Sequence, residues 1–308
     1  MEKRSFKERL FNEYIGKTFA TLCGMLIIAV TLSIIIFIGQ KGIQTFTKGN
    51  YGIIEFLFTN NWNPSETPAS FGALAFILGS TFVSMGAVVI SAPIAITLAV
   101  FVNVISKGLG NKLIKPSLEI LVGIPSVVYG WVGISVLVPF IKNHVGGMGF
   151  SLLAGILVLS LMILPTIATL SIDAIKSIPR EHIEASYGLG ATRWQTIKNV
   201  IIPGAKSGIL TGVVLGIARA FGEALAVQMV IGNAVKIPNG LLSSSSTLTS
   251  ILTMDMANTV GGTAWNDALW SLALILLVIS FLFILAIRKI EKMSWNRIWT
   301  VLAVGFFL

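Results

Sequence analysis

Long apolar runs separated by short polar segments make up most of the chain. A helix needs roughly 20 apolar residues to cross a bilayer, at a rise of about 1.5 Å per residue. Six runs reach that length, and they predict six transmembrane helices, at residues 18–39, 71–103, 118–141, 151–174, 203–232 and 268–288. Prolines inside or at the edges of these runs predict kinks or short helix breaks. They are Pro93, Pro125, Pro139 and Pro165.

Composition strengthens this prediction of an all-α, polytopic membrane protein. The chain is 55% hydrophobic and only 11% charged, whereas soluble domains carry about 25% charged residues. The net charge of +9 does not indicate nucleic-acid binding, because the basic residues cluster in short loops beside apolar runs. The single cysteine, Cys23, lies inside an apolar run, which excludes a disulfide framework within the chain.

The basic residues also predict an orientation. If the N-terminus is inside, 17 of the 22 Lys and Arg residues lie on the cytoplasmic side, four lie outside, and Arg219 falls within the fifth helix. This asymmetry favours a multi-pass protein with both termini in the cytoplasm.

Three regions are expected along the chain. Residues 1–17 carry alternating charged and apolar positions and predict a cytoplasmic amphipathic segment on the membrane surface. Residues 18–290 form the six-helix membrane domain. Residues 291–308 form a tail whose apolar part is too short to span, and we expect it to lie at the interface.

One cytoplasmic segment, residues 175–203, contains the pattern EASYGLGATRWQTIKNVIIP. It predicts a helix, a glycine turn and a second helical run, followed by a new membrane helix at the proline. The spacing resembles the EAA loop of ABC-importer permeases, which docks into a groove on an ATPase subunit. An ordinary amphipathic surface loop is the alternative. The residues that match the pattern are Glu184, Ala185, Ser186, Gly190 and Pro203.

Two charges lie within the predicted fifth helix, Arg219 and Glu223, four residues apart on one face. Charged side chains in a membrane are costly and usually face a bundle interior or a water path. They could neutralise each other and only join helices. Alternatively, Arg219 could supply positive potential along an anion pathway, with Glu223 moderating it so that the anion can leave.

The surrounding stretch GIARAFGEALAV is similar to the GRAxGETMAV stretch of phosphate ABC permeases, with Ala224 and Leu225 where Thr and Met are usual. The stretch IPSVVYGWVGISVLVPF, residues 124–140, resembles the PstC-type subunit more than its PstA-type partner. The resemblance implies a type I importer permease bundle in a bacterial or archaeal cell membrane. It also implies that Arg219 and Glu223 are critical for transport and that residues 184–203 contact the ATPase.

The resemblance further implies partners. These are a second permease of PstA type, two ATPase subunits of PstB type and an extracytoplasmic phosphate-binding protein of PstS type. The chain has no G-x-x-x-x-G-K-[ST] phosphate loop, so ATP would be bound by the partner ATPase, and this chain is expected to be a transport subunit without a cofactor of its own. Two long outer loops, 40–70 and 233–267, are expected to be flexible loops, a landing surface for the binding protein, or both.

Three other functions remain as alternatives. The first is a permease for another oxyanion, such as sulfate, molybdate or phosphonate. The second is a stand-alone channel or secondary transporter, which the EAA-like segment disfavours. An intramembrane enzyme is the least supported, because Arg219 and Glu223 lack a nucleophile–base pair or a metal-ligand set.

Overall fold

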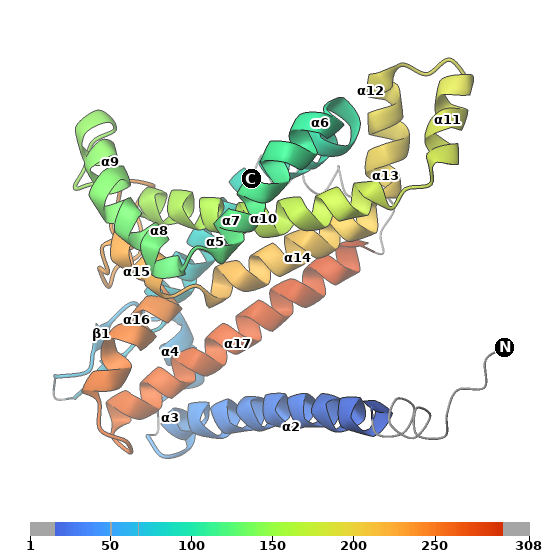
Figure 1. Cartoon of the computed structure of the whole chain (residues 1–308). Coiled ribbons are helices and arrows are strands. Elements are labelled where there is room, and N and C mark those ends of the chain that lie inside the picture. The colour runs from blue at the N-terminus through green and yellow to red at the C-terminus, as the bar shows by residue number, and fades with distance from the viewer. Residues whose placement is uncertain (1–15, 50, 67, 292–308) are drawn as a thin grey trace.

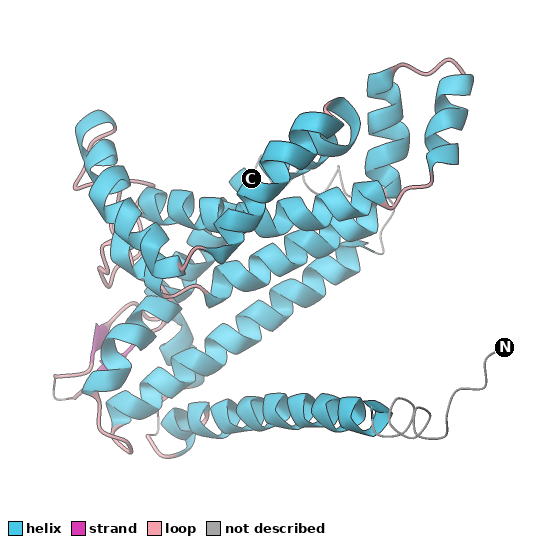
Figure 2. Cartoon of the chain, viewed as in Figure 1, coloured by secondary structure: helices cyan, strands magenta, loops and turns pink. Residues whose placement is uncertain are grey.

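The computed structural model describes residues 16–49, 51–66 and 68–291 (Figure 1). The predicted surface segment at the N-terminus, apart from its last two residues, and the C-terminal tail after residue 291 lie outside these ranges. The described chain is mostly helical, with one small antiparallel pair of strands (Figure 2). In this pair, β1 (Trp62–Asn63) and β2 (Ser70–Phe71) place Trp62 opposite Phe71.

Five helical stretches within the described residues are long and apolar enough to cross a membrane. A sixth span is obtained if two helices joined by a 66° bend are counted together, which agrees with the predicted six. The first four stretches are α2 (Gly16–Gly42) with α3 (Gln44–Thr47), α5 (Leu74–Val100) with the π-helix η2 (Phe101–Ile105), α8 (Ser126–Val132) to α9 (Val138–His144), and α10 (Leu152–Lys176). The fifth is α17 (Ala264–Glu291), and the bent pair leads into α14 (Lys206–Gly222).

The third predicted span is interrupted. Helix α7 (Lys115–Gly123) ends before Ile124 and Pro125, whose extended backbone leads into α8; the π-helix η4 (Gly133–Leu137) then joins α8 to α9. Pro125 therefore breaks the helix as predicted. The helices α5 and α10 continue through Pro93 and Pro165, respectively.

The fifth predicted span, 203–232, was wrong as a single helix. It consists of α14 and a short α15 (Leu225–Ile231), separated by Glu223, whose backbone is extended with ψ 123°. Gly232 then ends α15 with a left-handed backbone, φ 92°, which glycine adopts without strain. The break lies where the sequence carries its intramembrane charges.

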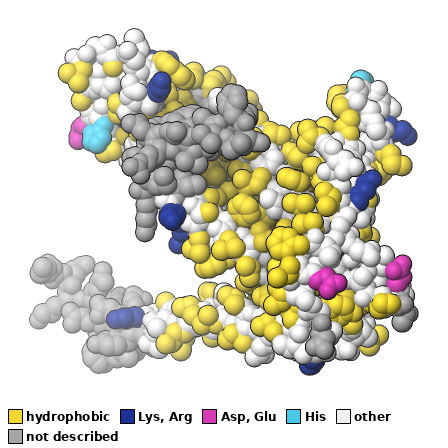
Figure 3. All heavy atoms as spheres, turned by 180° about the vertical axis from the view of Figure 1, so that it is seen from behind, with side chains coloured by type: hydrophobic (Ala, Val, Ile, Leu, Met, Phe, Trp, Pro, Cys, Tyr) yellow, Lys and Arg dark blue, Asp and Glu magenta, His cyan; other side chains and the backbone are white. Residues whose placement is uncertain are grey.

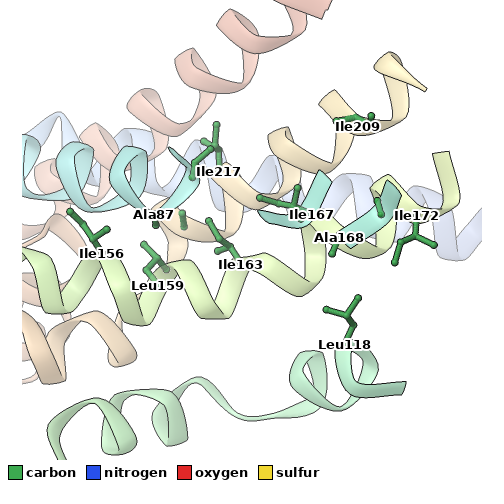
Figure 4. Close-up of a cluster of buried hydrophobic side chains, with 14 of the residues drawn as sticks. Ala87, Leu118, Ile156, Leu159, Ile163, Ile167, Ala168, Ile172, Ile209 and Ile217 are labelled. Atoms are coloured by element: carbon green, nitrogen blue, oxygen red, sulfur yellow. The ribbon is translucent and has the colours of Figure 1, made fainter. Parts of the chain in front are cut away.

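Helix α10 occupies the centre of the bundle, packed between α5 and α14 (Figure 4). Its buried side chains include Leu159, Ile163 and Ile167. Close packing with α14 depends on small residues: a Cβ atom at Gly208, Gly212 or Gly216 would crowd α10 side chains or backbone. Van der Waals contact between closely spaced helices therefore holds this part of the bundle together.

Helix α2 lies at the edge and packs mainly on α17. Its apolar side chains are exposed, which suits a surface that faces lipid or another membrane chain. Near its C-terminal end, the Ser271 hydroxyl of α17 donates to the Gly42 carbonyl over 2.7 Å and lies 2.7 Å from the Thr45 hydroxyl.

The two ends of the bundle differ. At one end lie β1, β2, α4 (Ile53–Phe58), α16 (Leu248–Asp255) and the 3₁₀ turn η6 (Met256–Asn258). At the other lie α6 (Lys107–Leu109), η3 (Gly110–Ile114), α11 (Arg180–Gly188), α12 (Arg193–Thr196), η5 (Ile197–Ile201) and α13 (Ile202–Gly204). Hydrophobic side chains cover much of the visible face between them, and charged side chains gather toward the ends (Figure 3). This distribution suits a bilayer around the middle.

Candidate functional site

The predicted helix–turn–helix is present at residues 180–204 and projects from the bundle (Figure 1). Helix α11 ends at Gly188, and Gly190, two residues further on, has a left-handed φ of +80°. The Gly190 N–H donates to the Tyr187 carbonyl over 2.9 Å, and the Ala191 N–H donates to the Ser186 carbonyl over 3.1 Å. These two bonds form a Schellman motif, which explains why glycine is required at this turn.

Side chains then join the two halves of residues 180–204, which we call the coupling loop after the ATPase-docking pattern that they resemble. The Ser186 and Thr196 hydroxyls lie 3.0 Å apart in a hydrogen bond between α11 and α12. Thr192 and Gln195 form a reciprocal capping box at the start of α12. Ser186 stands where the family pattern has Ala, so the substitution adds a polar contact within the loop.

Arg193 fixes the coupling loop to the membrane helices, a contact that the sequence analysis did not anticipate. Its guanidinium donates to the carbonyl oxygens of Val104 and Ile105, at the C-terminal end of η2. Carbonyls at a helix end lack intrahelical donors and carry partial negative charge. A guanidinium therefore suits this position, and it connects α12 directly to the end of the α5 span.

The tip of the coupling loop exposes apolar side chains. Leu189 is 90% exposed and Trp194 is 67% exposed. Glu184 and Ala185 are also exposed on α11, which has no buried residue. Large apolar side chains that project from a loop into solvent are typical of a surface that another protein covers.

The coupling loop is followed directly by the apolar helix α14. Pro203 lies in the first turn of α13, where a missing N–H costs little. The chain then bends by 66° and continues as α14. Arg219 lies 16 residues beyond Pro203, about 24 Å along a helix. Residues 184–203 and the charged residues Arg219 and Glu223 thus lie at opposite ends of one continuous helical stretch that is bent by 66° after Gly204.

Arg219 is in the last turn of α14 and is half-buried. Its Nη1 donates to the Thr166 hydroxyl of α10 over 3.0 Å. A guanidinium has five donors in a planar fork, and no other hydrogen bond of its side chain is formed within the described residues. Most of its donors therefore remain available.

The prediction that Arg219 and Glu223 share one helical face was wrong, and the two form no ion pair in the described part of the chain. The helix ends at Gly222, and Glu223 adopts an extended backbone instead. Its Oε1 accepts a hydrogen bond from the Ala226 N–H over 3.1 Å, at the start of α15. A carboxylate is favourable there because the first N–H groups of a helix have no other partner.

A hydroxyl-rich segment, residues 244–250, lies against this break. Ser245, Ser246 and Ser250 are at most 1% exposed. The Thr249 hydroxyl donates to the Glu223 carbonyl over 2.8 Å. Ser80 of α5 accepts from the Leu248 N–H over 2.8 Å.

The expectation that residues 233–267 form an outer loop therefore needs correction for the hydroxyl-rich segment, which enters the bundle. A Cβ atom at Gly79 of α5 would overlap the Ser246 carbonyl, so glycine permits this close approach. Irregular backbone at membrane depth is tolerated where it is buried in protein or lines a cavity.

A cavity of about 10 Å³ remains between these elements, enough for about one water molecule. It is lined by Glu223 and by hydroxyls, together with a few apolar side chains. The polar members are Ser80, Ser84, Glu223, Thr247 and Thr249. Hydroxyls both donate and accept, so this arrangement could coordinate a small polar ion if the helices moved apart.

Comparison with known proteins identifies the wider group. Residues 91–293 match the family described as "Binding-protein-dependent transport system inner membrane component". The chain is 50% identical, over 94% of each sequence, to the probable ABC transporter permease protein YqgH of Bacillus subtilis. It is 32% identical to the phosphate transport system permease protein PstC of Mesorhizobium japonicum, covering 85% of this chain and 86% of that protein.

Solved structures support the same fold. A bacterial alginate ABC transporter, solved with a periplasmic protein bound to an alginate pentasaccharide, aligns with a TM-score of 0.63 and 16% identity over 93% of this chain and all of that one. The inward-facing MetNI methionine ABC transporter aligns with a TM-score of 0.53 and 22% identity over 70% of this chain and 90% of that one. Both likenesses concern the fold alone.

Proposed function

The chain belongs to the family of inner membrane components of binding-protein-dependent transport systems, as an ABC importer permease of type I, and we propose that it carries inorganic phosphate as a PstC-type subunit. The observation that carries the proposal is Arg219, which lies in the last turn of α14 just before the break at Glu223, with most of its donors unused. Arg219 is not among the residues that line the hydroxyl-rich cavity beyond the break. Its planar fork suits the oxygen atoms of phosphate.

Glu223 favours phosphate over an oxyanion that carries no proton. At neutral pH phosphate keeps at least one P–OH group, which can donate a hydrogen bond, whereas sulfate cannot. Only one carboxylate oxygen of Glu223 has a hydrogen-bond partner among the described residues. The other can accept from P–OH and would repel a fully deprotonated anion.

The small size of the cavity supports transport by alternating openings. Phosphate does not fit a space for about one water, so α5, α16 and the α14–α15 break must separate to admit it. The structure therefore suits a closed pathway. A ligand-driven change of this kind requires that a partner bind one state better than the other.

ATP binding to partner subunits would make those subunits bind one of the two states better than the other. The exposed Leu189 and Trp194 at the tip of the coupling loop supply an apolar contact for an ATPase, and Arg193 connects the contact to η2. The assembly that we propose has a second permease of PstA type, two PstB-type ATPases that bind the ATP, and a PstS-type binding protein outside. Importing an anion against a membrane potential costs about 2.3 kcal/mol per charge per 100 mV.

The orientation follows from the same proposal. If the coupling loop contacts an ATPase in the cytoplasm, β1, β2 and α16 face outward, and both termini are cytoplasmic. The excess of Lys and Arg on the coupling-loop side supports this orientation in a cell membrane.

Import of another oxyanion is the second candidate. Ala224 stands where the phosphate permeases have Thr, which removes one hydroxyl near the pathway. The remaining hydroxyls could coordinate any tetrahedral oxyanion. The YqgH relative is described only as a probable ABC transporter permease, without a substrate, and so leaves this candidate open.

One experiment separates the two candidates. The complete complex, with its binding protein, is reconstituted in vesicles, and ATP-dependent uptake of labelled phosphate is measured with excess unlabelled phosphate, sulfate or molybdate. We expect only phosphate to compete. Competition by sulfate at equal concentration would assign the pathway to another oxyanion, and uptake without ATP would contradict the ABC mechanism.

A further inference from the structure

A second polar pocket lies at the coupling-loop end of the bundle, away from Arg219. Its volume is about 260 Å³. The walls come from η2, from α6, η3 and the start of α7, from the last turn of α10, and from α11 and the end of η5. The pocket thus joins two membrane helices to the coupling loop, and the pathway described above uses none of its lining.

Four cationic side chains line this pocket. They are Lys107, Lys115, Lys176 and Arg180. In the part of the chain that the structure describes, none of the four forms an ion pair. The carboxylates on the neighbouring helical segments are exposed and outside the lining; they are Glu119, Asp173, Glu181 and Glu184. Four like charges around one concave site repel each other and raise the local concentration of anions.

The other lining residues fix the shape of the pocket. The amide group of Asn103 already has structural partners, because its Nδ2 donates to the carbonyls of Ala99 and Ile172, both over 3.0 Å. This contact holds η2 against α10. Ile175 and Ile201 are at most 5% exposed and supply an apolar side. The cations therefore project from a packed framework that already has its own hydrogen bonds.

From this geometry we infer that the pocket binds a phosphate-bearing anion, held by the four cations between the ends of α5 and α10 and the first turn of α11. Lysine ammonium groups and a guanidinium are the usual ligands of phosphate oxygens. The same chemistry is offered by free inorganic phosphate in the cytoplasm and by the headgroup phosphate of an anionic lipid. The inference goes beyond the proposed function and holds whichever oxyanion is imported.

An occupant would connect three separate segments of the chain. Arg180 belongs to the coupling loop, Lys176 to α10, and Lys107 and Lys115 to the segment after α5. An anion shared among them stabilises one arrangement of these ends. The anion would then change the coupling between the coupling loop and the membrane helices only to the extent that it binds this arrangement more tightly than the others.

The test measures protection of this region directly, without transport. The full-length chain is placed in nanodiscs made only of phosphatidylcholine, and hydrogen–deuterium exchange is followed in peptides covering residues 103–116 and 176–184. One arm adds inorganic phosphate, with chloride at equal ionic strength as reference. The second arm replaces part of the lipid with phosphatidylglycerol, without added phosphate.

We expect slower exchange in at least one arm. Protection by inorganic phosphate in phosphatidylcholine identifies the free ion as the occupant, and protection only with phosphatidylglycerol identifies the lipid headgroup. Lys107→Gln/Lys115→Gln should weaken the apparent affinity about tenfold or more, since each removes a charge-assisted hydrogen bond. Lys107→Arg/Lys115→Arg keeps both charges and should retain the protection.

Lys112→Gln is the matched control, because Lys112 is an exposed cation in η3 that does not line the pocket. It should leave protection unchanged. An equal loss in Lys112→Gln would reduce the effect to general surface charge and overturn the inference. So would the absence of protection in both arms, or protection that appears only when the ATPase subunit is added.

Discussion

Replacing Arg219 distinguishes two roles for its positive charge, which either attracts the transported anion or only stabilises the structure. Among the described residues its side chain bonds only to Thr166, and Glu223 caps α15 instead of pairing with it. Arg219→Gln should therefore abolish most phosphate uptake, and Arg219→Gln/Glu223→Gln should not restore it. If the two charges only neutralised each other, the double variant would recover, because it leaves no unpaired charge at membrane depth.

The magnitude follows from the half-buried position of Arg219. A unit charge about 4 Å from an anion contributes about 4 kcal/mol at an effective dielectric constant of about 20. Glutamine keeps a hydrogen-bond donor, worth about 1 kcal/mol. The remaining difference of about 3 kcal/mol corresponds to a loss of about a hundredfold. Thr166→Val keeps the positive charge and removes only the hydroxyl, so we expect a loss of about tenfold at most.

The assay is ATP-dependent uptake of labelled phosphate in cells, with a blot for the assembled complex. Membrane abundance should be close to normal in all variants, since Arg219 makes one side-chain hydrogen bond within the described residues. Restored uptake in the double variant would refute the reasoning and leave Arg219 a structural residue. A loss in Thr166→Val as large as in Arg219→Gln would show that positioning, and not charge, dominates.

The remaining predictions concern the coupling loop and the topology. Glu184→Lys places the opposite charge on exposed α11 and should leave the complex assembled but uncouple ATP hydrolysis from uptake; normal transport-linked hydrolysis would exclude an ATPase contact there. Ser186→Ala removes the bond to Thr196 and should destabilise the coupling loop by about 1 kcal/mol, measured as faster hydrogen exchange in residues 180–196 with unchanged exchange elsewhere. In a Cys23→Ser background, Ser177→Cys should resist an impermeant thiol reagent outside intact cells, whereas Asn239→Cys should react; labelling of the first would overturn the orientation.

Hydrophobic length was enough to find the spans, because a bilayer requires long apolar helices whatever their neighbours. The coupling loop was also predictable, since Gly190 supplies the left-handed turn that its position needs. Length and composition could not locate the break at Glu223. Gly222 followed by an acidic residue can end one helix and cap the next, but the same letters also fit a continuous helix.

The burial of the hydroxyl-rich segment could not be predicted from the sequence either. The letters LLSSSSTLTS are typical of an exposed loop, yet Ser245 and Ser250 are 0% exposed. What buries them is the space left by Gly79 and the acceptor offered by Ser80, both far away in sequence. Composition alone does not reveal which polar loops find such partners. The role of Arg193 was missed for the same reason, because the carbonyls that it contacts belong to η2.

The bend between α13 and α14 has a mechanical consequence. Helix α14 has 17 residues and so extends about 25 Å from the bend to the charged break. A rotation of only about 10° at this elbow displaces the far end of such a rod by about 4 Å, which is comparable to the width of a water-filled gap. In the proposed mechanism, a small tilt that an ATPase imposes on the coupling loop would therefore be amplified into a displacement of several ångströms near Arg219.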